Sequence, residues 1–242
     1  MLPVTTPAVA DLVAAFRDRF TAAGDPQAAS AEQRYLKSDL HFFGVRVPVI
    51  RQTAKAFHRE HRTFDRDSLV ALAAALWETD WHELRSVGIA LLELYGPVLQ
   101  GDDMAFVESL LDRANTWAHV DWLAVHVAGS LVRRFPVAKA DVSRWAVSPN
   151  FWLRRSALLA LLSDMRSGAG DFALFETLAV PMLTEKEFFI RKAIGWILRD
   201  VSGRRPELTY TFLRTHRQSV SGLTLREGAK HLPAEMRADL AL

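Results

Sequence analysis

Apolar residues recur at helical spacing through most of the chain. Between residues 65 and 77 they stand three and four positions apart, and the same spacing predicts helices over 83–95, 121–132, 152–162, 172–183 and 187–201. Asp65 or Asp67 can cap the first of these helices, and Thr184 with Glu187 can form a capping box at the last. No segment alternates like a strand, and no linker is long enough to split the chain. The pattern predicts an all-α fold, with residues 1–242 as one domain.

Several of the predicted helices open alike, with an apolar residue, an arginine and then a small residue. The arginines are Arg85, Arg154, Arg191 and Arg226, separated by 69, 37 and 35 residues. The first gap is about twice the others, and Asp121 falls inside it, 36 residues after Arg85 and 33 before Arg154. A period near 36 residues with two helices per unit indicates an α-solenoid of HEAT-like antiparallel helix pairs. N-terminal helices at about 6–60 would precede repeats at about 65–232.

Equivalent positions of a solenoid line the same face, so the four arginines predict a basic stripe along a concave groove. Asp121 occupies the middle slot of that stripe. One interpretation is structural, in which Asp121 caps its helix or pairs with a neighbouring arginine. The other is functional, in which an ionised carboxylate stands in a groove built for polyanions.

Composition narrows the class of protein. Half of the 242 residues are hydrophobic and 24% are charged, which is typical of a globular protein. The chain has no cysteine, no signal peptide and no apolar run near the roughly 18 residues that a membrane span needs, so we expect a soluble intracellular protein. Lys and Arg outnumber Asp and Glu by only 30 to 28, yet the basic residues cluster. Such clusters are typical of a nucleic-acid-binding face, although solvated helix faces would look the same.

The seven tryptophans divide by their surroundings in the sequence. Trp77, Trp122 and Trp145 lie on apolar faces, and we expect them in the core. Trp117 precedes Asp121 by one helical turn, so the indole and the carboxylate can share a face. Trp196 follows Lys192 by one turn. Periodicity alone leaves both a core position and a surface position open for Trp117 and Trp196.

Five segments resemble the bacterial DNA alkylation repair glycosylases of the AlkD family. They are YLKS at 35–38, FGVRVPVIR at 43–51, NTWAHVD at 115–121, FWLRRSA at 151–157 and KEFFIRKAIGWILR at 186–199. The resemblance extends over about 11–232, and the last segment is its most specific part. The family has stacked HEAT-like helix pairs around a basic groove for duplex DNA, in agreement with the repeat alignment. Two small departures, His41 and the extra charge of Arg154, leave the implied activity unchanged.

The resemblance implies which residues act. Trp117, Asp121 and Trp196 match the family's catalytic residues, and Arg155 matches an arginine expected to hold the phosphate beside the lesion. Together with the basic stripe, it implies DNA contacts from Tyr35, Arg85, Arg154, Arg155, Arg191, Lys192, Arg199 and Arg226. An ionised Asp121 would stabilise an oxocarbenium-like sugar and orient water, while the indoles would face the cationic base and sugar.

The implied activity is that of a monofunctional glycosylase of base excision repair. It would release N3- and N7-alkylated purines from duplex DNA while the base stays stacked, without a cofactor or metal. The resemblance also implies a monomer in the bacterial cytoplasm, associated with the nucleoid through DNA. Two alternatives stay open: a self-resistance glycosylase for bulky minor-groove adducts, and a non-catalytic HEAT-repeat scaffold that binds DNA or protein.

Overall fold

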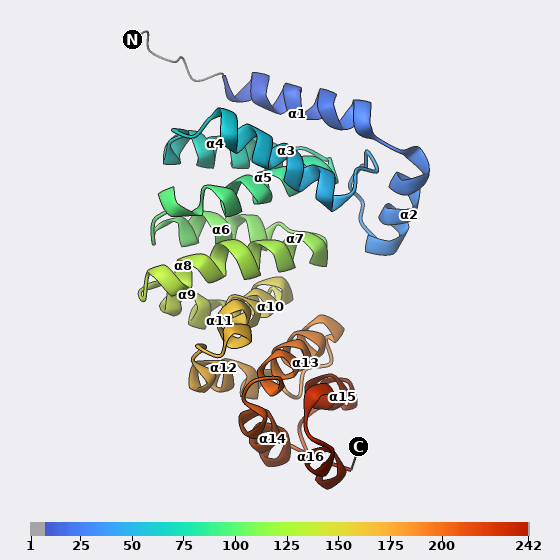
Figure 1. Cartoon of the computed structure of the whole chain (residues 1–242), viewed down its shortest axis with the longest axis vertical. Helices are drawn as coiled ribbons and strands as arrows, with labels where there is room; N and C mark the ends of the chain where they lie inside the picture. Colours follow the sequence, from blue (N-terminus) through green and yellow to red (C-terminus); the bar gives the residue numbers. More distant parts are fainter. Residues whose placement is uncertain (1–7, 242) are drawn as a thin grey trace. The chain divides into compact units, whose positions relative to one another are not determined.

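Almost all of the chain is helical in the computed structural model, which describes residues 8–241 (Figure 1). Within this part of the chain the one β-type pairing is a bridge between His41 and Trp81. None of the described helices is both long enough and apolar enough to span a membrane. The all-α prediction is confirmed.

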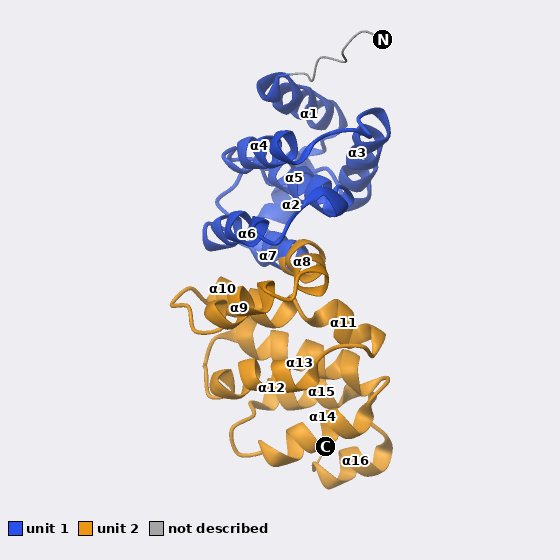
Figure 2. Cartoon of the chain, turned by 90° about the vertical axis from the view of Figure 1, so that its left-hand side faces the viewer, with its two compact units in different colours: residues 1–123 blue, residues 124–242 orange. Residues whose placement is uncertain are grey.

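The chain divides into two compact units, Met1–Leu123 and Ala124–Leu242 (Figure 2). The first unit contains α1 (Val9–Ala23), α2 (Pro26–Leu36), α3 (Val47–Glu60), α4 (Arg66–Trp77), α5 (His82–Leu94), α6 (Asp103–Asp112) and α7 (Trp117–Trp122). The second contains α8 (Gly129–Arg134), α9 (Ala138–Trp145), α10 (Phe151–Leu159), α11 (Leu162–Ser167), α12 (Phe172–Ala179), α13 (Phe188–Ser202), α14 (Pro206–Thr215), α15 (Gly222–Gly228) and α16 (Ala234–Asp239). Organisation as a single domain around a concave groove stays a prediction.

Helix α5 is the central helix of the first unit. It packs on α3 and α4 and is buried over most of its length. The partner helix α4 begins where the sequence predicted, because the Asp65 carboxylate accepts the backbone N–H of Ser68 at 2.8 Å. The pair α4–α5 thus corresponds to one predicted helix pair.

Helix α13 has the same place in the second unit, where it packs on α10, α14 and α15. Its start corrects the predicted capping box. The N-cap is Glu187 itself, whose carboxylate accepts the N–H of Phe189 at 3.2 Å, and Thr184 lies outside the helix. Glu187 alone therefore caps the start of α13, whereas the sequence predicted that Thr184 and Glu187 would cap it together.

The predicted helix over 121–132 is interrupted. Helix α7 already begins at Trp117, because the Thr116 side chain caps it by accepting the N–H of Ala118. A π-helical segment, Leu123–Ala128, follows α7 and precedes α8. The spacing of apolar residues indicates which side chains are buried, but it does not indicate which carbonyl accepts each backbone N–H. The pattern therefore does not predict the π-helical segment. Such segments are frequent next to functional sites.

Two other predicted helices are shorter than the pattern indicated. The one over 152–162 ends at Leu159, and the chain turns before α11. The one over 172–183 ends at Ala179 and continues as a 3-10 turn through Pro181, which has no N–H to extend the α-helical bonding.

Candidate functional site

The loop 37–46 is held by the Glu83 side chain and lies close to the backbone at the start of α2. The fully buried carboxylate of Glu83 accepts the N–H groups of Phe43, Gly44 and Val45 at 3.0, 2.7 and 3.0 Å. Gly44 has φ +80°, and a Cβ there would lie 2.1 Å from the carbonyl oxygen of Asp25. The loop therefore requires both the glycine and the carboxylate, and it anchors the start of α2 to α5.

An aromatic pair stands on the surface of the first unit. Tyr35, on the last turn of α2, meets Trp117 edge to face, with ring centroids 5.8 Å apart and planes at 85°. Tyr35 is 72% exposed and Trp117 is half-buried. Trp117 therefore lies outside the core, and the two residues that the sequence nominated separately are in contact.

Asp121 lies on the same face of α7 as Trp117, one turn further along. The carboxylate does not cap its helix, because Thr116 is the N-cap and Asp121 is the fifth helical residue. That excludes the capping interpretation. Asp121 is half-buried, and the π-helical segment Leu123–Ala128 begins two residues after it.

The inward face of α7 rests on a pair of buried histidines. His119 and His82 stack with ring centroids 4.4 Å apart, and they are 1% and 3% exposed. The Nε2 of His119 lies 3.1 Å from the carbonyl oxygen of His82 and 3.1 Å from the Ser86 hydroxyl. Since a carbonyl only accepts, Nε2 of His119 carries a hydrogen and is the donor. Thus the residue between Trp117 and Asp121 is bonded to the central helix α5.

Both histidines resist protonation. Burial, helped by the nearby charge of Arg85, lowers the pKa of His82 to about 4. Burial and the neighbouring His82 lower the pKa of His119 well below its usual value. The two histidines beneath the inward face of α7 are therefore uncharged at neutral pH.

The repeating arginines have a local structural role that the sequence did not reveal. Arg85, Arg154 and Arg191 each donate to the carbonyl oxygen six residues earlier, at 2.9, 2.6 and 2.7 Å. Each bond clamps the turn that precedes the arginine's own helix. The shared contact supports the repeat alignment, and it means that part of each guanidinium is already engaged within its unit.

Arg154 is the most engaged of the three. Its Nε and terminal nitrogen also pair with both carboxylate oxygens of Glu185, at 3.0 and 2.8 Å, and its side chain is 18% exposed. Arg226, by contrast, shows no such clamp among the contacts of α15 in the described chain. The predicted stripe therefore contains arginines in different states of engagement.

Arg155 is buried, contrary to what a phosphate contact would suggest. It is 3% exposed, donates to the carbonyl oxygen of Phe189 and lies 5.6 Å from the centre of that ring. This position favours a role in holding the start of α13 over direct contact with a phosphate.

Trp196 occupies a charged face of α13. It is half-buried, with Lys192 one turn before it and Arg199 one turn after it. Glu227 of α15 pairs with both cations, at 3.7 Å from Lys192 Nζ and 3.0 Å from a terminal nitrogen of Arg199. Thus Trp196, like Trp117, lies outside the core.

The core assignments hold for two of three tryptophans. Trp77 and Trp145 are 2% and 0% exposed. Trp122 is half-buried instead: its Nε1 donates to Glu93 at 2.6 Å, and the Arg51 guanidinium lies 4.4 Å from the centre of its ring. The core prediction for Trp122 is wrong because the indole finds a polar partner and a cation at the edge of the unit.

Sequence reasoning missed Glu83, His119 and Glu227. Each acts through a partner that is far away in the sequence, so no local spacing marks it. Within residues 8–241, no group of three His, Cys, Asp or Glu side chains is arranged to hold a metal ion.

Comparisons with known proteins place this geometry in context. The family described as DNA alkylation repair enzyme matches residues 16–232. A solved structure from Enterococcus faecalis, described as a predicted DNA alkylation repair enzyme, has 25% identity and a TM-score of 0.78, over 87% of this chain and 97% of the other. AlkD2 from Streptococcus mutans has a similar fold, with 17% identity and a TM-score of 0.61 over 86% of this chain and 99% of the other. No curated protein sequence matches the chain.

Proposed function

Because the chain belongs to the DNA alkylation repair enzyme family, we propose that it is a DNA glycosylase for N3- and N7-alkylated purines in duplex DNA. The observation that carries the proposal is the outer face of α7. There an indole at the surface and a carboxylate stand one turn apart, and exposed Tyr35 packs against the indole.

The chemistry of an alkylated purine requires few catalytic residues. Alkylation at N3 or N7 makes the purine cationic, so the base is already a good leaving group and needs no strong general acid. As the N-glycosidic bond breaks, its electron pair stays with the purine and positive charge spreads into the deoxyribose. The remaining requirements are stabilisation of that charge and delivery of one water molecule.

Asp121 meets both requirements in this proposal. An ionised carboxylate stabilises the oxocarbenium-like sugar and accepts a proton from the attacking water, which leaves an abasic site and the free base. Trp117 offers its π face to the cationic purine and sugar, an attraction of about 0.5–2 kcal/mol. Tyr35 holds the indole in place from the side.

His119 is a positioning residue for this group. Its bonds to the His82 carbonyl and Ser86 tie α7 to α5, so Trp117 and Asp121 are carried on a fixed helix face. Because the buried imidazole is neutral, His119 acts through its hydrogen bonds and adds no charge of its own beneath α7.

For the second unit, taken by itself, we propose DNA contacts and one further indole. Trp196 keeps the role implied by the resemblance, an electron-rich face for the cationic lesion. We assign phosphate contacts chiefly to Lys192, Arg199 and Arg226, together with the exposed parts of Arg85, Arg154 and Arg191. For Arg155 we propose support of α13 through the Phe189 carbonyl.

The direct test is release of free base. The full-length protein is incubated with a duplex containing a single N7-methylguanine, and free 7-methylguanine is measured by mass spectrometry alongside abasic sites. We expect both products in equal amounts, and none from the undamaged duplex. Binding to the duplex without release would favour the non-catalytic scaffold and contradict the proposal.

A further inference from the structure

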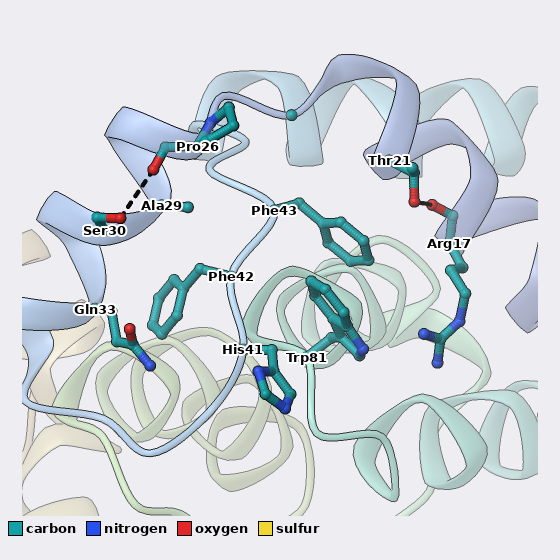
Figure 3. A pocket seen from close by; sticks show the side chains of 11 residues that line it. Arg17, Thr21, Pro26, Ala29, Ser30, Gln33, His41, Phe42, Phe43 and Trp81 are labelled. Carbon is teal, nitrogen blue, oxygen red and sulfur yellow. Dashed lines mark hydrogen bonds between the residues drawn. The ribbon is translucent and has the colours of Figure 1, made fainter.

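The first unit contains a second concave site that the proposed chemistry does not use. A cavity of about 510 Å³ lies between α1, α2 and the segment 41–43, with Trp81 in its wall (Figure 3). Neither Trp117 nor Asp121 lines it. Its volume falls within the range of small-molecule sites, about 300–1,000 Å³.

Aromatic rings form a rigid wall of this cavity. Trp81 stacks on Phe43 with ring centroids 3.8 Å apart and planes at 17°, and the His41 ring lies 5.3 Å from the indole. His41 and Trp81 are also joined through the backbone, since His41 N–H donates to the Asp80 carbonyl and the His41 carbonyl accepts from His82. The wall therefore exists before any ligand arrives.

The charge of the cavity is positive. Arg17 places its guanidinium carbon 5.8 Å from the centre of the Trp81 ring. Its backbone carbonyl accepts the Thr21 hydroxyl, whereas its guanidinium makes no hydrogen bond or ion pair with any residue between 8 and 241. None of the described residues lining the cavity is an Asp or a Glu. An anion is thus favoured beside a flat aromatic surface.

Polar groups complete the lining. Gln33 donates its amide N–H to the Leu40 carbonyl at 3.0 Å, which leaves its amide oxygen as an acceptor. The Ser30 hydroxyl bonds to the Pro26 carbonyl of its own helix. Figure 3 shows Trp81 between His41 and Arg17, with Gln33 on the His41 side.

From this arrangement we propose that the cavity binds one unpaired nucleotide. The base stacks on the Trp81–His41 wall, and the phosphate, one sugar away, pairs with Arg17. Aromatic stacking with a neighbouring cation is the general way in which proteins hold unpaired bases without reading their sequence. The site adds a binding function for unpaired nucleotides, and it is independent of base release.

The test follows the seven indole N–H signals of the ¹⁵N-labelled full chain by NMR. The probes are dAMP, deoxyadenosine and inorganic phosphate, and Trp81→Phe assigns the Trp81 signal. We expect dAMP to shift the Trp81 signal saturably, deoxyadenosine to do so more weakly and phosphate alone to leave it unchanged.

Two exposed residues separate the contributions of base and phosphate. Arg17→Gln should weaken the binding of dAMP by roughly tenfold and leave the binding of deoxyadenosine unchanged, because only the phosphate contact is lost. His41→Ala should weaken the binding of both dAMP and deoxyadenosine by roughly tenfold, since stacking of the base on the imidazole is lost. The matched control is Arg19→Gln, an exposed arginine of the same helix that does not line this cavity.

A deoxyadenosine trinucleotide identifies the source of the nucleotide. Binding at least tenfold tighter than dAMP assigns single-stranded DNA, and equal binding assigns free nucleotides. Three results would overturn the proposal: no saturable shift at Trp81, an equal shift with phosphate alone, or an equal loss of dAMP binding in Arg19→Gln.

Discussion

Exposure separates the tryptophans of this chain into two kinds. Trp145 is fully buried and Trp77 is 2% exposed, whereas Trp117 and Trp196 are half-buried beside exposed or charged side chains. Core and surface indoles have different energetic roles: a core indole contributes stability through packing, and a surface indole can offer its π face to a ligand. The two kinds therefore respond differently to truncation.

We predict that Trp117→Ala lowers excision of a cationic lesion while costing less than about 1.5 kcal/mol of stability. Trp145→Ala should cost about 3–5 kcal/mol, because it opens a cavity in the core. Thermal unfolding and single-turnover excision are measured on the same preparations. Normal excision by a folded but strongly destabilised Trp117→Ala would show that this indole serves packing alone.

The buried histidines make stability depend on pH. In the folded protein the pKa of His82 is about 4, below the roughly 6.5 of an unfolded chain, so the unfolded state binds more protons at mildly acid pH. Stability is therefore fully present above about pH 6.5 and falls as the pH drops toward 4, by up to about 1.4 kcal/mol per pH unit for this group.

We predict that His82→Phe flattens the dependence of Tm on pH between 6.5 and 4. Phenylalanine retains the stack with Phe42 and His119, and the backbone carbonyl that His119 uses is unchanged. The control His231→Phe alters an exposed histidine and should leave the curve parallel to that of the wild type. Parallel curves for both variants would contradict the assignment of His82.

At the scale of elements, the loop 37–46 depends on one carboxylate. Glu83 is a residue of α5, yet its three N–H bonds determine the path of a loop about forty residues earlier in the chain. Bonds of several backbone N–H groups to one buried carboxylate are strong, and they are lost together when that side chain is changed. The loop and the start of α2 should therefore respond as one structure.

We predict that Glu83→Gln destabilises the protein by about 2–4 kcal/mol, since an amide offers fewer acceptor sites and adds N–H groups that face other donors. Denaturation in urea measures the loss. Glu60→Gln, at an exposed position on α3, serves as the control and should change stability by less than about 0.5 kcal/mol. Equal stability of the two variants would contradict the role of the Glu83 carboxylate in holding the loop 37–46.

Local sequence signals predicted where the helices lie better than they predicted which residues the helices bring into contact. The Asp65 cap of α4 and the burial of Trp77 followed from spacing, because each depends on residues within a turn or two. The π-helical segment after α7 did not, since it preserves the burial pattern and changes only the hydrogen bonding. Arg155 was assigned to a phosphate because its charge is visible in the sequence, whereas its burial against Phe189 is not.

Across the whole molecule, a net charge of only +2 accompanies many internal ion pairs. In the proposed function, half-exposed cations such as Lys192 and Arg199 exchange Glu227 for phosphate when DNA binds. The exchange releases counterions from the DNA, so affinity should depend on salt.

We predict a log–log slope of about −3 or steeper for binding to undamaged duplex, because the proposed contacts of Lys192, Arg199 and Arg226 reach at least three phosphates. Lys192→Gln should reduce the slope by about one, while Lys139→Gln, at an exposed lysine of α9 outside the proposed DNA contacts, should not. Fluorescence anisotropy over a series of salt concentrations gives the slopes. A slope near zero would contradict binding through phosphates.

The central claim is that Asp121 stabilises the charge that develops as the base leaves. The most direct measurement is single-turnover release of 7-methylguanine by wild type, Asp121→Asn and the exposed control Asp102→Asn, with duplex affinity and Tm recorded for each. We predict that Asp121→Asn retains fold and affinity but releases base at least about a hundredfold more slowly, while Asp102→Asn behaves as wild type. Release at the wild-type rate by Asp121→Asn would contradict the account.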